Sequence, residues 1–407
     1  MQTNLSEEFR GTPEGAEAEA ILRKCVHCGF CTATCPTYQV LGNELDGPRG
    51  RIYLIKQMLE GEAPTRATQL HLDRCLTCRN CESTCPSGVE YGKLADIGRA
   101  VVERKVKRGP GSTALRWALK EGLTSPAFAP AMKLGQAVRG LLPQRLKEKV
   151  PPRQDAGRLP TREHARKVLM LAGCVQPAMM PNIGAATARV LDAAGIQAVF
   201  ARGAGCCGAV KFHLNDQDGG RAQMRANIDA WWPLVERGEV EAIVMNASGC
   251  GVTVKEYGHF LQHDAAYAEK ARRIGELTRD LSELLPELVN ALQGKVRAGG
   301  GMLAYHPPCT LQHGQKLRGG VEQHLQALGF KVRAALDEPH LCCGSAGTYS
   351  VLHPDIAHTL RDRKLGHLGA LEPQAIISAN IGCITHLQGG TATPVKHWIE
   401  VLDAAMA

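Results

Sequence analysis

"CVHCGFCTATCP" (25–36) and "CLTCRNCESTCP" (75–86) together hold eight of the sixteen cysteines in this chain. Each stretch has the spacing C-x2-C-x2-C-x3-C-P. Thiolates at this spacing are typical of iron-sulfur cubanes, because one short loop can wrap three corners of a cubane and leave the fourth corner to a cysteine from elsewhere. The two stretches therefore predict two 4Fe-4S clusters.

The ligands of each cluster come from both stretches in this interpretation. In two-cluster ferredoxins the last cysteine of each run crosses to the other cluster. A proline after that cysteine, at Pro36 and Pro86, suits such a crossing because proline fixes φ and cannot continue a helix. The first cluster would be held by Cys25, Cys28, Cys31 and Cys85, and the second by Cys75, Cys78, Cys81 and Cys35.

Zinc is the alternative occupant, because paired C-x2-C units also build zinc ribbons. Zinc sites usually consist of two separated cysteine pairs, and they require neither a third cysteine two residues further on nor a complete repeat of the pattern. Val26, Phe30 and Leu76 stand between the ligands and are expected to shield the clusters locally. His27 is expected at the surface or behind the ligands rather than among them.

The composition argues against a small secreted protein stapled by disulfides. A chain of 407 residues has room for roughly two or three domains that each bury a core. Its start, "MQTNLSEEFRGTPEGAEAEA", lacks the basic and apolar segments of a signal peptide, so the cysteines are expected to be reduced, in the cytosol, as ligands. No stretch approaches the roughly 18 to 20 apolar residues of a membrane-spanning helix.

The net charge of +8 is moderate, and much of the basic excess lies between Arg99 and Lys167. Such a surface suits an anionic membrane or an acidic partner subunit better than it suits nucleic acid. An ordinary solvated basic face is an equally good interpretation of the same charge run.

Cysteine pattern and periodicity separate the chain into regions. The first region, 1–105, carries both cysteine runs, and "PRGRIYLIKQMLEG" between them predicts a helix with its apolar residues on one face. Residues 106–166 are expected to form a helical connection that ends in a proline-rich linker. From Lys167 onward, short apolar strands alternate with helices, which predicts parallel sheets flanked by helices.

The strand-helix alternation occurs twice, in 167–296 and in 302–407. Both regions contain an early cysteine, a "CCG" loop and a late cysteine, and the corresponding cysteines lie 133 to 136 residues apart. We interpret this as an internal duplication that gives two similar α/β domains. The glycine-rich stretch "RAGGG" (297–301) is the expected hinge.

In each repeat the cysteines fall where strands are expected to end, which is the edge where parallel sheets place their ligands. Three interpretations stay open: a metal or cluster site in one or both repeats, a redox-active thiol pair, or a structural remnant. His306 and His313 either tune or bind the second site, or are hydrogen-bonded loop histidines. The candidate ligands are Cys174, Cys206, Cys207 and Cys250 in the first repeat, and Cys309, Cys342, Cys343 and Cys383 in the second.

The repeats resemble the cysteine-rich CCG domain of heterodisulfide reductases. The fuller motif ends in C-x-x-C, where this chain has Thr253 after Cys250 and His386 after Cys383, which argues against a noncubane cluster of the heterodisulfide type. Over its whole length the chain resembles the iron-sulfur subunits of glycolate oxidases, in the two cysteine runs and in phrases such as "AGCCGAV", "NIDAWWP", "HLCCGSAGTY" and "ANIGC". The iron-sulfur subunits of anaerobic glycerol-3-phosphate dehydrogenases share the architecture.

The resemblance implies a mainly α-helical ferredoxin-like domain with two clusters, followed by two tandem α/β CCG domains with parallel sheets. It also implies that glycolate is oxidised to glyoxylate on FAD-containing partner subunits. This chain would hold no catalytic residue and would carry electrons towards membrane quinone, as a peripheral protein on the cytoplasmic face of the inner membrane. In agreement, we find no G-x-G-x-x-G nucleotide fingerprint that opens a helix after a strand.

Two alternatives remain at this stage. The cysteines alone do not distinguish glycolate from lactate or glycerol 3-phosphate, because the substrate would not touch this subunit. A thiol or disulfide reductase of the heterodisulfide type, acting at a CCG site, is the alternative from another class. We regard an iron-sulfur scaffold or sensor without electron transfer as less consistent with the duplicated α/β domains.

Overall fold

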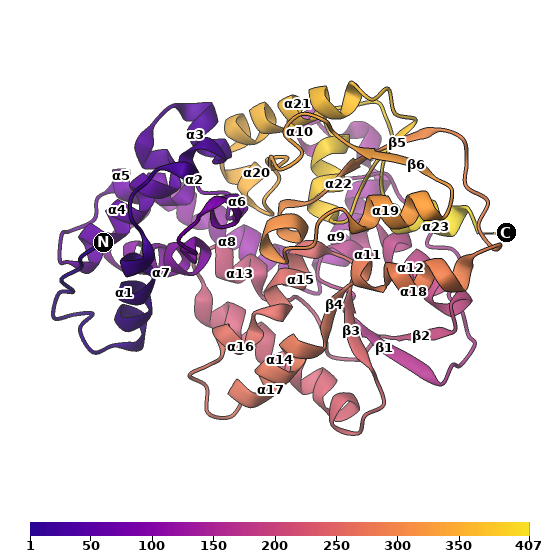
Figure 1. Ribbon diagram of the computed structural model, residues 1–407, viewed down its shortest axis with the longest axis horizontal. Helices are drawn as coiled ribbons and strands as arrows, with labels where there is room; N and C mark the ends of the chain where they lie inside the picture. Colours follow the sequence, from indigo (N-terminus) through magenta and orange to yellow (C-terminus); the bar gives the residue numbers. More distant parts are fainter. Residues whose placement is uncertain (407) are drawn as a thin grey trace. The chain divides into compact units, whose positions relative to one another are not determined.

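The computed structural model describes residues 1–406, apart from the side chain at position 145 (Figure 1). The chain divides into two compact units. The first unit consists of Met1–Arg116 and His340–Leu360, and the second contains the rest of the described chain. Within residues 1–406, no helix combines the length and the apolar character that crossing a bilayer requires.

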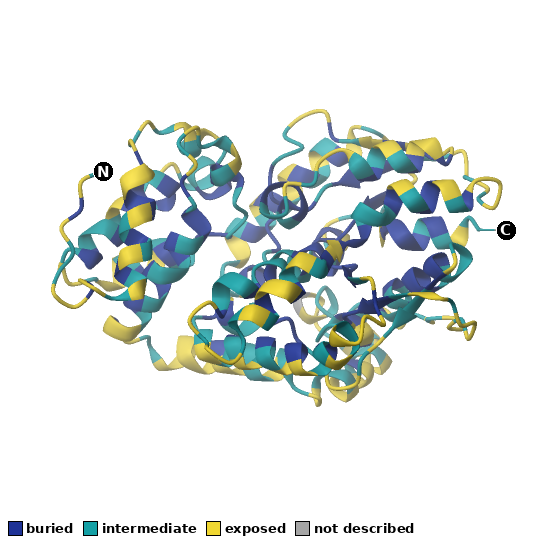
Figure 2. Ribbon diagram, turned by 60° about the horizontal axis from the view of Figure 1, so that its bottom comes forward, coloured by how far each residue is buried: buried dark blue, intermediate teal, exposed yellow. Residues whose placement is uncertain are grey.

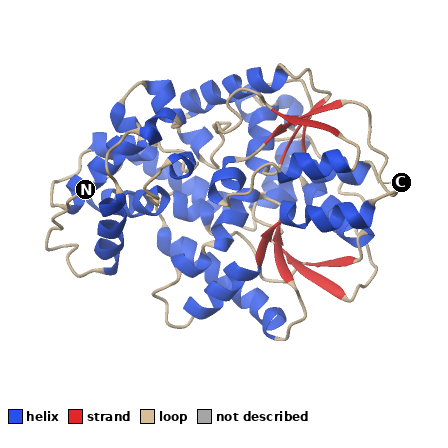
Figure 3. Ribbon diagram, in the orientation of Figure 1, coloured by secondary structure: helices blue, strands red, loops and turns tan. Residues whose placement is uncertain are grey.

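The first unit is helical (Figure 3). Two of its helices, α8 (Pro110–Thr124) and α21 (Pro354–Gly369), begin here and end in the second unit. The other elements are α1 (Pro13–Lys24), α2 (Phe30–Ala33), α3 (Pro36–Leu41), η1 (Glu44–Asp46), α4 (Pro48–Leu59), α5 (Arg66–Asp73), α6 (Asn80–Thr84), α7 (Tyr91–Lys105) and α20 (Tyr349–Leu352).

Helix α4 shows how the sequence builds this unit. It begins at Pro48, where the missing N–H of proline is not needed, and it buries Ile52, Ile55 and Met58 on one face, as predicted. This face packs against α7. Gly98 on α7 permits the close approach, because a Cβ at that position would lie 2.5 Å from Cγ1 of Ile55. The resulting core supports the loops that carry the cysteines.

The second unit contains two parallel sheets with helices around them (Figure 3). Its strands are β1 (Arg166–Met170), β2 (Ile196–Val199), β3 (Ala242–Met245), β4 (Thr278–Asp280), β5 (Met302–His306), β6 (Lys331–Ala334), β7 (Ala375–Ser378) and β8 (Val395–His397). Its remaining helices are α9 (Phe128–Ala137), η2 (Arg139–Leu141), α10 (Gln144–Lys147), α11 (Gln176–Met179), α12 (Pro181–Ala193), α13 (Ala209–His213), α14 (Gln217–Glu236), α15 (Ser248–Lys255), α16 (Tyr257–Phe260), α17 (Ala268–Leu277), η3 (Leu281–Leu284), α18 (Leu285–Leu292), η4 (Thr310–Gly314), α19 (Gly320–Ala327), α22 (Ile381–Gln388) and α23 (Trp398–Ala404).

The two sheets have the same strand order, β2-β1-β3-β4 and β6-β5-β7-β8, and every neighbouring pair is parallel. The central strands are buried and apolar because helices cover both faces of each sheet (Figure 2). Sequence analysis missed β4 and β8. Each has three residues with an exposed cation in the middle, Arg279 or Lys396, so neither shows the pattern of a buried strand.

The two repeats are tied together through backbone and side-chain hydrogen bonds. The amide of Ser248 donates to the carbonyl oxygen of Ala379 at 3.1 Å. The Nε2 atom of His397 donates to the carbonyl oxygen of Asn246 at 2.9 Å, and burial lowers the pKa of this histidine to about 3, so it stays neutral. The loops that follow β3 and β7 are therefore held in defined positions, and these loops lead to two of the candidate cysteines.

Candidate metal centres

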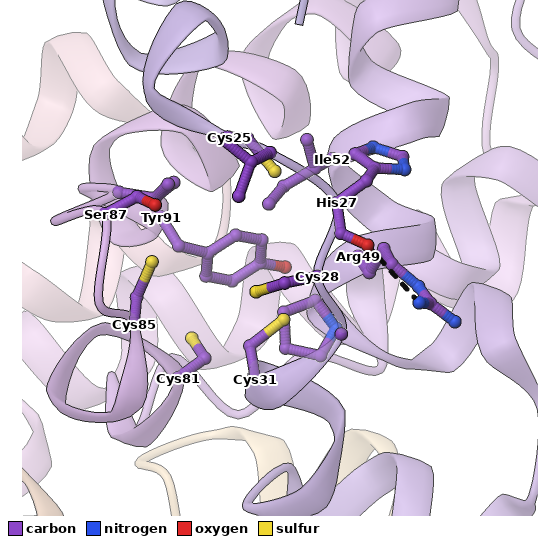
Figure 4. Close-up of a pocket in the computed structure, with 14 residues that line it drawn as sticks. Cys25, His27, Cys28, Cys31, Arg49, Ile52, Cys81, Cys85, Ser87 and Tyr91 are labelled. Atoms are coloured by element: carbon purple, nitrogen blue, oxygen red, sulfur yellow. Dashed lines mark hydrogen bonds between the residues drawn. The ribbon is translucent and has the colours of Figure 1, made fainter.

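A cavity in the first unit gathers thiols from both cysteine runs (Figure 4). It contains about 420 Å³ of space free of protein atoms, its opening to solvent included. Figure 4 shows the cysteine side chains around the ring of Tyr91. The cysteines that line this first cavity are Cys25, Cys28, Cys31, Cys81 and Cys85.

A second cavity of about 300 Å³ lies beside the first. Tyr91, Pro48 and Cys81 line both cavities, which therefore share a wall. Arg51 and Leu76 also line the second cavity. The cysteines around this second cavity are Cys35, Cys75, Cys78 and Cys81.

The last cysteine of each run lies at the cavity of the other run: Cys35 lines the second cavity, and Cys85 lines the first, where Cys81 of its own run is also present. Helices α2 and α6 pack together, with the hydroxyl oxygens of Thr34 and Thr84 3.0 Å apart. The Nδ2 atom of Asn80 donates to the carbonyl oxygen of Thr34 at 3.0 Å. Cys35 and Cys85 stand at the ends of these tied segments and turn into extended backbone before the prolines. This placement supports the crossing of Cys35 and Cys85, whereas the division of the eight cysteines into two ligand sets stays a prediction because Cys81 lines both cavities.

Buried positive charge borders the second cavity. Arg51 is 1% exposed, donates to the carbonyl oxygen of His71 at 2.7 Å and lies 3.7 Å from a carboxylate oxygen of Asp46. Arg99 donates to the carbonyl oxygen of Cys75 at 2.6 Å. Burial by itself would raise the pKa of the Cys75 thiol, but the charges of Arg51 and Arg99, with hydrogen bonds from Thr77 and Tyr91, together lower it. The cavity therefore contains a thiol that ionises readily, which is the form that metals bind.

Other thiols in the two cavities need a cation before they can ionise. Burial, together with the neighbouring Cys25 and Cys85, raises the pKa of Cys31 to about 11. Burial also raises the pKa of Cys81 well above its usual value. Bound iron would supply the missing positive charge, and these thiols would bind it as thiolates. Sulfur donors that gather from two runs around each cavity therefore fit 4Fe-4S clusters.

In the second unit, the four candidate cysteines of the first repeat lie together. Cys174 follows β1, Cys206 and Cys207 precede α13, and Cys250 lies in the first turn of α15. Hydrogen bonds join their thiols in a row: Cys174 and Cys207 both donate to Cys206, and a further hydrogen bond links Cys207 and Cys250. The strands β1 and β3 end before Cys174 and Cys250, so these cysteines do not close the strands as the sequence analysis expected.

The Cys206–Cys207 pair has a fixed backbone and uneven acidity. The Nδ2 atom of Asn227 donates to the carbonyl oxygen of Cys206 at 2.8 Å, and the hydroxyl of Tyr257 donates to that of Cys207 at 2.9 Å. Hydrogen bonds from the thiols of Cys174 and Cys207 lower the pKa of Cys206 against the effect of burial. The same hydrogen bonds, together with burial, raise the pKa of Cys174 and Cys207. Four adjacent sulfurs around one readily formed thiolate make a donor set that suits a soft metal ion.

The candidate cysteines of the second repeat are divided between the two units. Cys309 and Cys383 are buried in the second unit, whereas Cys342 and Cys343 are buried in the segment His340–Leu360 of the first unit. A ring nitrogen of His306 lies within 4.8 Å of the sulfur of Cys383. His306 is buried, and neither of its ring nitrogens has a hydrogen-bond partner among the described residues. A metal site that uses all four of these cysteines stays a prediction.

His313, the other histidine that the sequence singled out, is also buried, and its Nδ1 atom lies 3.2 Å from Nη2 of Arg318. Burial lowers the pKa of His306 well below its usual value, so this ring is neutral. A neutral imidazole without hydrogen bonds keeps a free lone pair, which is what a metal ligand needs. Of the two histidines, His306 is therefore the better candidate ligand.

Two family descriptions match the chain. Residues 21–89 match a 4Fe-4S dicluster domain, and residues 168–255 and 303–388 each match a cysteine-rich domain. The glycolate oxidase iron-sulfur subunit of Escherichia coli (strain K12) is 55% identical, over 100% of this chain and 99% of that protein. The chain belongs to the family of glycolate oxidase iron-sulfur subunits.

More distant relatives of this glycolate oxidase subunit family cover less of the chain. The probable glycolate oxidase iron-sulfur subunit of Bacillus subtilis (strain 168) is 28% identical, over 91% of this chain and 89% of that protein. Lactate utilization protein A of Bacillus licheniformis is 27% identical, over 58% of this chain and 99% of that protein. The dicluster match spans both cysteine runs and confirms the predicted iron-sulfur cofactor, and the two cysteine-rich matches confirm the predicted pair of CCG domains.

Sequence analysis missed the cations beside the second cavity of this glycolate oxidase subunit. Arg51 stands four residues before Ile55 and seven before Met58, which places a charged residue on the buried face of α4. A cation at a core position is unfavourable unless charged or polar groups surround it, so the pattern did contain a signal for a buried charge network. Of the three residues expected to shield the clusters, Leu76 is buried, whereas Val26 and Phe30 are exposed.

We propose that the four thiols of the first repeat bind a metal ion or cluster, and Cys206→Ser tests this. The variant removes the central sulfur of the row, so the chain is expected to lose the iron or zinc of this site while both 4Fe-4S clusters keep their EPR signals. The measurement is iron and zinc content per chain. Thr253→Ala, at the position where the fuller CCG motif has cysteine, is the matched control and should leave the metal content unchanged. A wild-type protein with about eight irons and no zinc would contradict the proposal.

Proposed function

We propose that this chain is the electron-transfer subunit of a flavin-dependent glycolate dehydrogenase, which oxidises glycolate to glyoxylate. The observation that carries the proposal is 55% identity to the E. coli subunit over the whole chain. The two thiol-lined cavities with a shared wall support the same role, because adjacent one-electron centres form a relay. The substrate would react on FAD-containing partner subunits, and no catalytic residue is assigned to this chain.

The ligand sets belong to the proposal. We assign Cys25, Cys28, Cys31 and Cys85 to the first cluster, and Cys75, Cys78, Cys81 and Cys35 to the second. Such clusters, once bound, store one electron each at neighbouring positions. The residues of this chain hold the sulfur donors in place and set the charge around the second cavity through Arg51 and Arg99.

Glycolate is favoured over lactate as the substrate of the complex. The relatives named for lactate utilization match 58% of this chain at 27% or 28% identity, whereas the glycolate subunit of E. coli matches the full chain at twice that identity. The heterodisulfide-type alternative is weaker, because Thr253 occupies the cysteine position of the fuller motif and its hydroxyl donates to the carbonyl oxygen of Gly249 at 3.0 Å.

The acceptor that we propose is a membrane quinone, reached at the cytoplasmic face of the inner membrane. Helix α9 packs on α11, where Nε2 of Gln136 donates to the carbonyl oxygen of Ala178. Leu134, Val138 and Leu141 are exposed on α9 and just after it. The stretch 125–147 contains four basic residues and no acidic one. An exposed apolar stripe among basic residues suits the surface of an anionic bilayer.

Reconstitution with the flavin subunits tests the proposed function. Under anaerobic conditions, glycolate is expected to produce the EPR signals of reduced clusters when the flavin subunits are present, because the electrons must first leave the substrate on a flavin. This chain alone with glycolate should give no signal. Vesicles that contain quinone and anionic lipid should then reoxidise the clusters.

Two outcomes would contradict parts of this proposal. Reduction of the clusters by glycolate with this chain alone would show that glycolate is oxidised on this chain and not on the flavin subunits. Reoxidation that is equally fast with neutral vesicles, or that does not occur with any quinone vesicle, would remove the support for the membrane acceptor. Lactate, supplied at the same concentration with the same flavin subunits, is the control for the substrate and should give less reduction than glycolate.

A further inference from the structure

The two cysteine runs form the same loop but differ in what covers it. In the first run His27 and Gly29 have φ angles of 57° and 86°, and in the second run Thr77 and Arg79 have φ angles of 51° and 57°. Because the two loops have the same backbone conformation, side chains at equivalent positions leave the backbone in the same direction. The residue after the first cysteine and the residue before the third are therefore directly comparable between the runs.

These equivalent positions have opposite environments. In the second run Leu76 is 4% exposed and Asn80 is 3% exposed, because the chain itself covers them. In the first run their counterparts Val26 and Phe30 are 68% and 61% exposed. Two large apolar side chains of the first loop are thus exposed at positions where the equivalent side chains of the second loop are buried. Exposed apolar groups that are gathered in one place mark an interaction site.

The exposed loop is held rigidly rather than loosely. Arg49 donates from Nε to a carboxylate oxygen of Glu44 at 2.7 Å and from Nη1 to the carbonyl oxygen of His27 at 3.5 Å. A side chain at Gly29 would meet this guanidinium, since a Cβ there would lie 2.7 Å from Nη1. The ring of His27 packs edge-on against Tyr53, with 6.3 Å between ring centroids. A surface that is ordered in advance loses little conformational entropy when a partner binds.

The same loop brings sulfur to the surface. All sixteen cysteines lie in the described part of the chain, and Cys28 is the one that is exposed. Around the second cavity, Cys35, Cys75 and Cys81 are buried and Cys78 is partly buried. Cys28 at the first cavity is therefore the candidate ligand that another redox protein can approach most directly.

We infer that Val26, Phe30 and Tyr53 form a docking patch for the flavin-bearing partner subunit, through which electrons reach the first cluster. The inference rests on the proposed function and adds where the partner binds. Oxidation of one glycolate releases two electrons and two protons. The protons stay with the flavin subunit and solvent, and the electrons cross the docking patch one at a time, one for each of the two clusters.

Exchange of the apolar groups on the docking patch for charge tests the inference. The double variant Val26→Asp, Phe30→Asp is expected to bind the purified flavin subunits at least ten-fold more weakly, and glycolate should reduce its clusters correspondingly more slowly at a fixed subunit concentration. Dithionite should still produce the EPR signals of both clusters, because neither side chain is a ligand. Leu336→Asp is the matched control: Leu336 is 81% exposed on a loop of the second unit, and its exchange should not change the affinity.

A measurement on the wild-type protein keeps the inference testable even if the double variant fails to bind its clusters. Hydrogen exchange of residues 26–30 is expected to slow when the flavin subunits are added. Unchanged exchange, or wild-type affinity in the double variant, would overturn the inference. Vesicle binding that depends on Val26 and Phe30 without any flavin subunit would also overturn it, by assigning the docking patch to the membrane. Failure of the proposed function is distinct, because it would show as absent glycolate-driven reduction in the wild-type complex, whatever the affinity.

Discussion

Cys35→Ser is expected to damage the second cluster and spare the first, while Cys85→Ser is expected to do the reverse. The reason lies in the crossing of the two runs: Cys35 lines the cavity with Cys75 and Cys78, and Cys85 lines the cavity with Cys25 and its neighbours. Each variant removes one of four sulfur ligands, so the iron content due to the two clusters should fall by about half. EPR spectra and iron content per chain are the measurements.

Reference variants make this test independent of any prior assignment of the signals. Cys28→Ser and Cys78→Ser change cysteines that both the crossed and the uncrossed arrangement place in the first and second cluster, respectively. Their spectra therefore identify which signal belongs to which cluster. If the spectrum of Cys35→Ser resembles that of Cys28→Ser instead of Cys78→Ser, the crossing is wrong and each run holds its own cluster.

Arg51→Met is expected to lower both the stability of the first unit and the reduction potential of the second cluster. The guanidinium is buried among Asp46, Thr37 and the backbone of His71, so its loss leaves buried acceptors and a carboxylate with fewer partners. Removal of one partner from a buried ion pair typically costs about 3–5 kcal/mol of unfolding free energy. His71 and Arg74 remain beside Asp46 and place the expected loss near the lower end, at about 3 kcal/mol.

The potential of the second cluster should fall because the variant removes a positive charge from beside Cys75. That charge, together with Arg99, lowers the pKa of the Cys75 thiol against the effect of burial, and it would stabilise the added negative charge of a reduced cluster in the same way. The measurements are denaturant unfolding and a redox titration followed by EPR. The first cluster serves as the internal reference.

Arg49→Met is the matched control for Arg51. Arg49 pairs with Glu44 at 2.7 Å, but both side chains are more than a third exposed, so solvent screens the pair and its loss should cost less than about 1 kcal/mol. The second cluster should keep its potential in this variant. Equal losses of stability from the two variants would contradict the prediction, because they would show that the buried Arg51 contributes no more to stability than the exposed Arg49.

Much of the fold could be predicted because its pattern is local and repeated. The spacing of the cysteines depends on a few consecutive residues, and the apolar strands with their intervening helices recur within each repeat. The short edge strands β4 and β8 could not be predicted in this way. Their three residues gain strand structure from hydrogen bonds with β3 and β7, and no periodic pattern in so short a stretch announces such pairing.

The burial of side chains in the two cysteine loops could not be predicted from the sequence. Val26 and Leu76 are both apolar and occupy the same position in identical motifs, and sequence analysis assigned both to the shield. Of the two, only Leu76 is buried. The burial of a side chain depends on which distant segments fold over it, and this information is not contained in the residues on either side.

The sequence by itself determined the kind of cofactor, the number of clusters, the duplication and the family, because ligand chemistry and repeated phrases are written in consecutive residues. Tertiary structure decided how those parts act together. It brought the sulfurs of opposite runs around shared cavities and placed Arg51 beside Cys75. It also left Val26 and Phe30 of the first cysteine loop exposed while it buried Leu76 and Asn80 of the second. Charge, desolvation and exposure act between residues that meet only in the folded chain, so only the folded chain shows which side chains of the two cysteine loops are exposed.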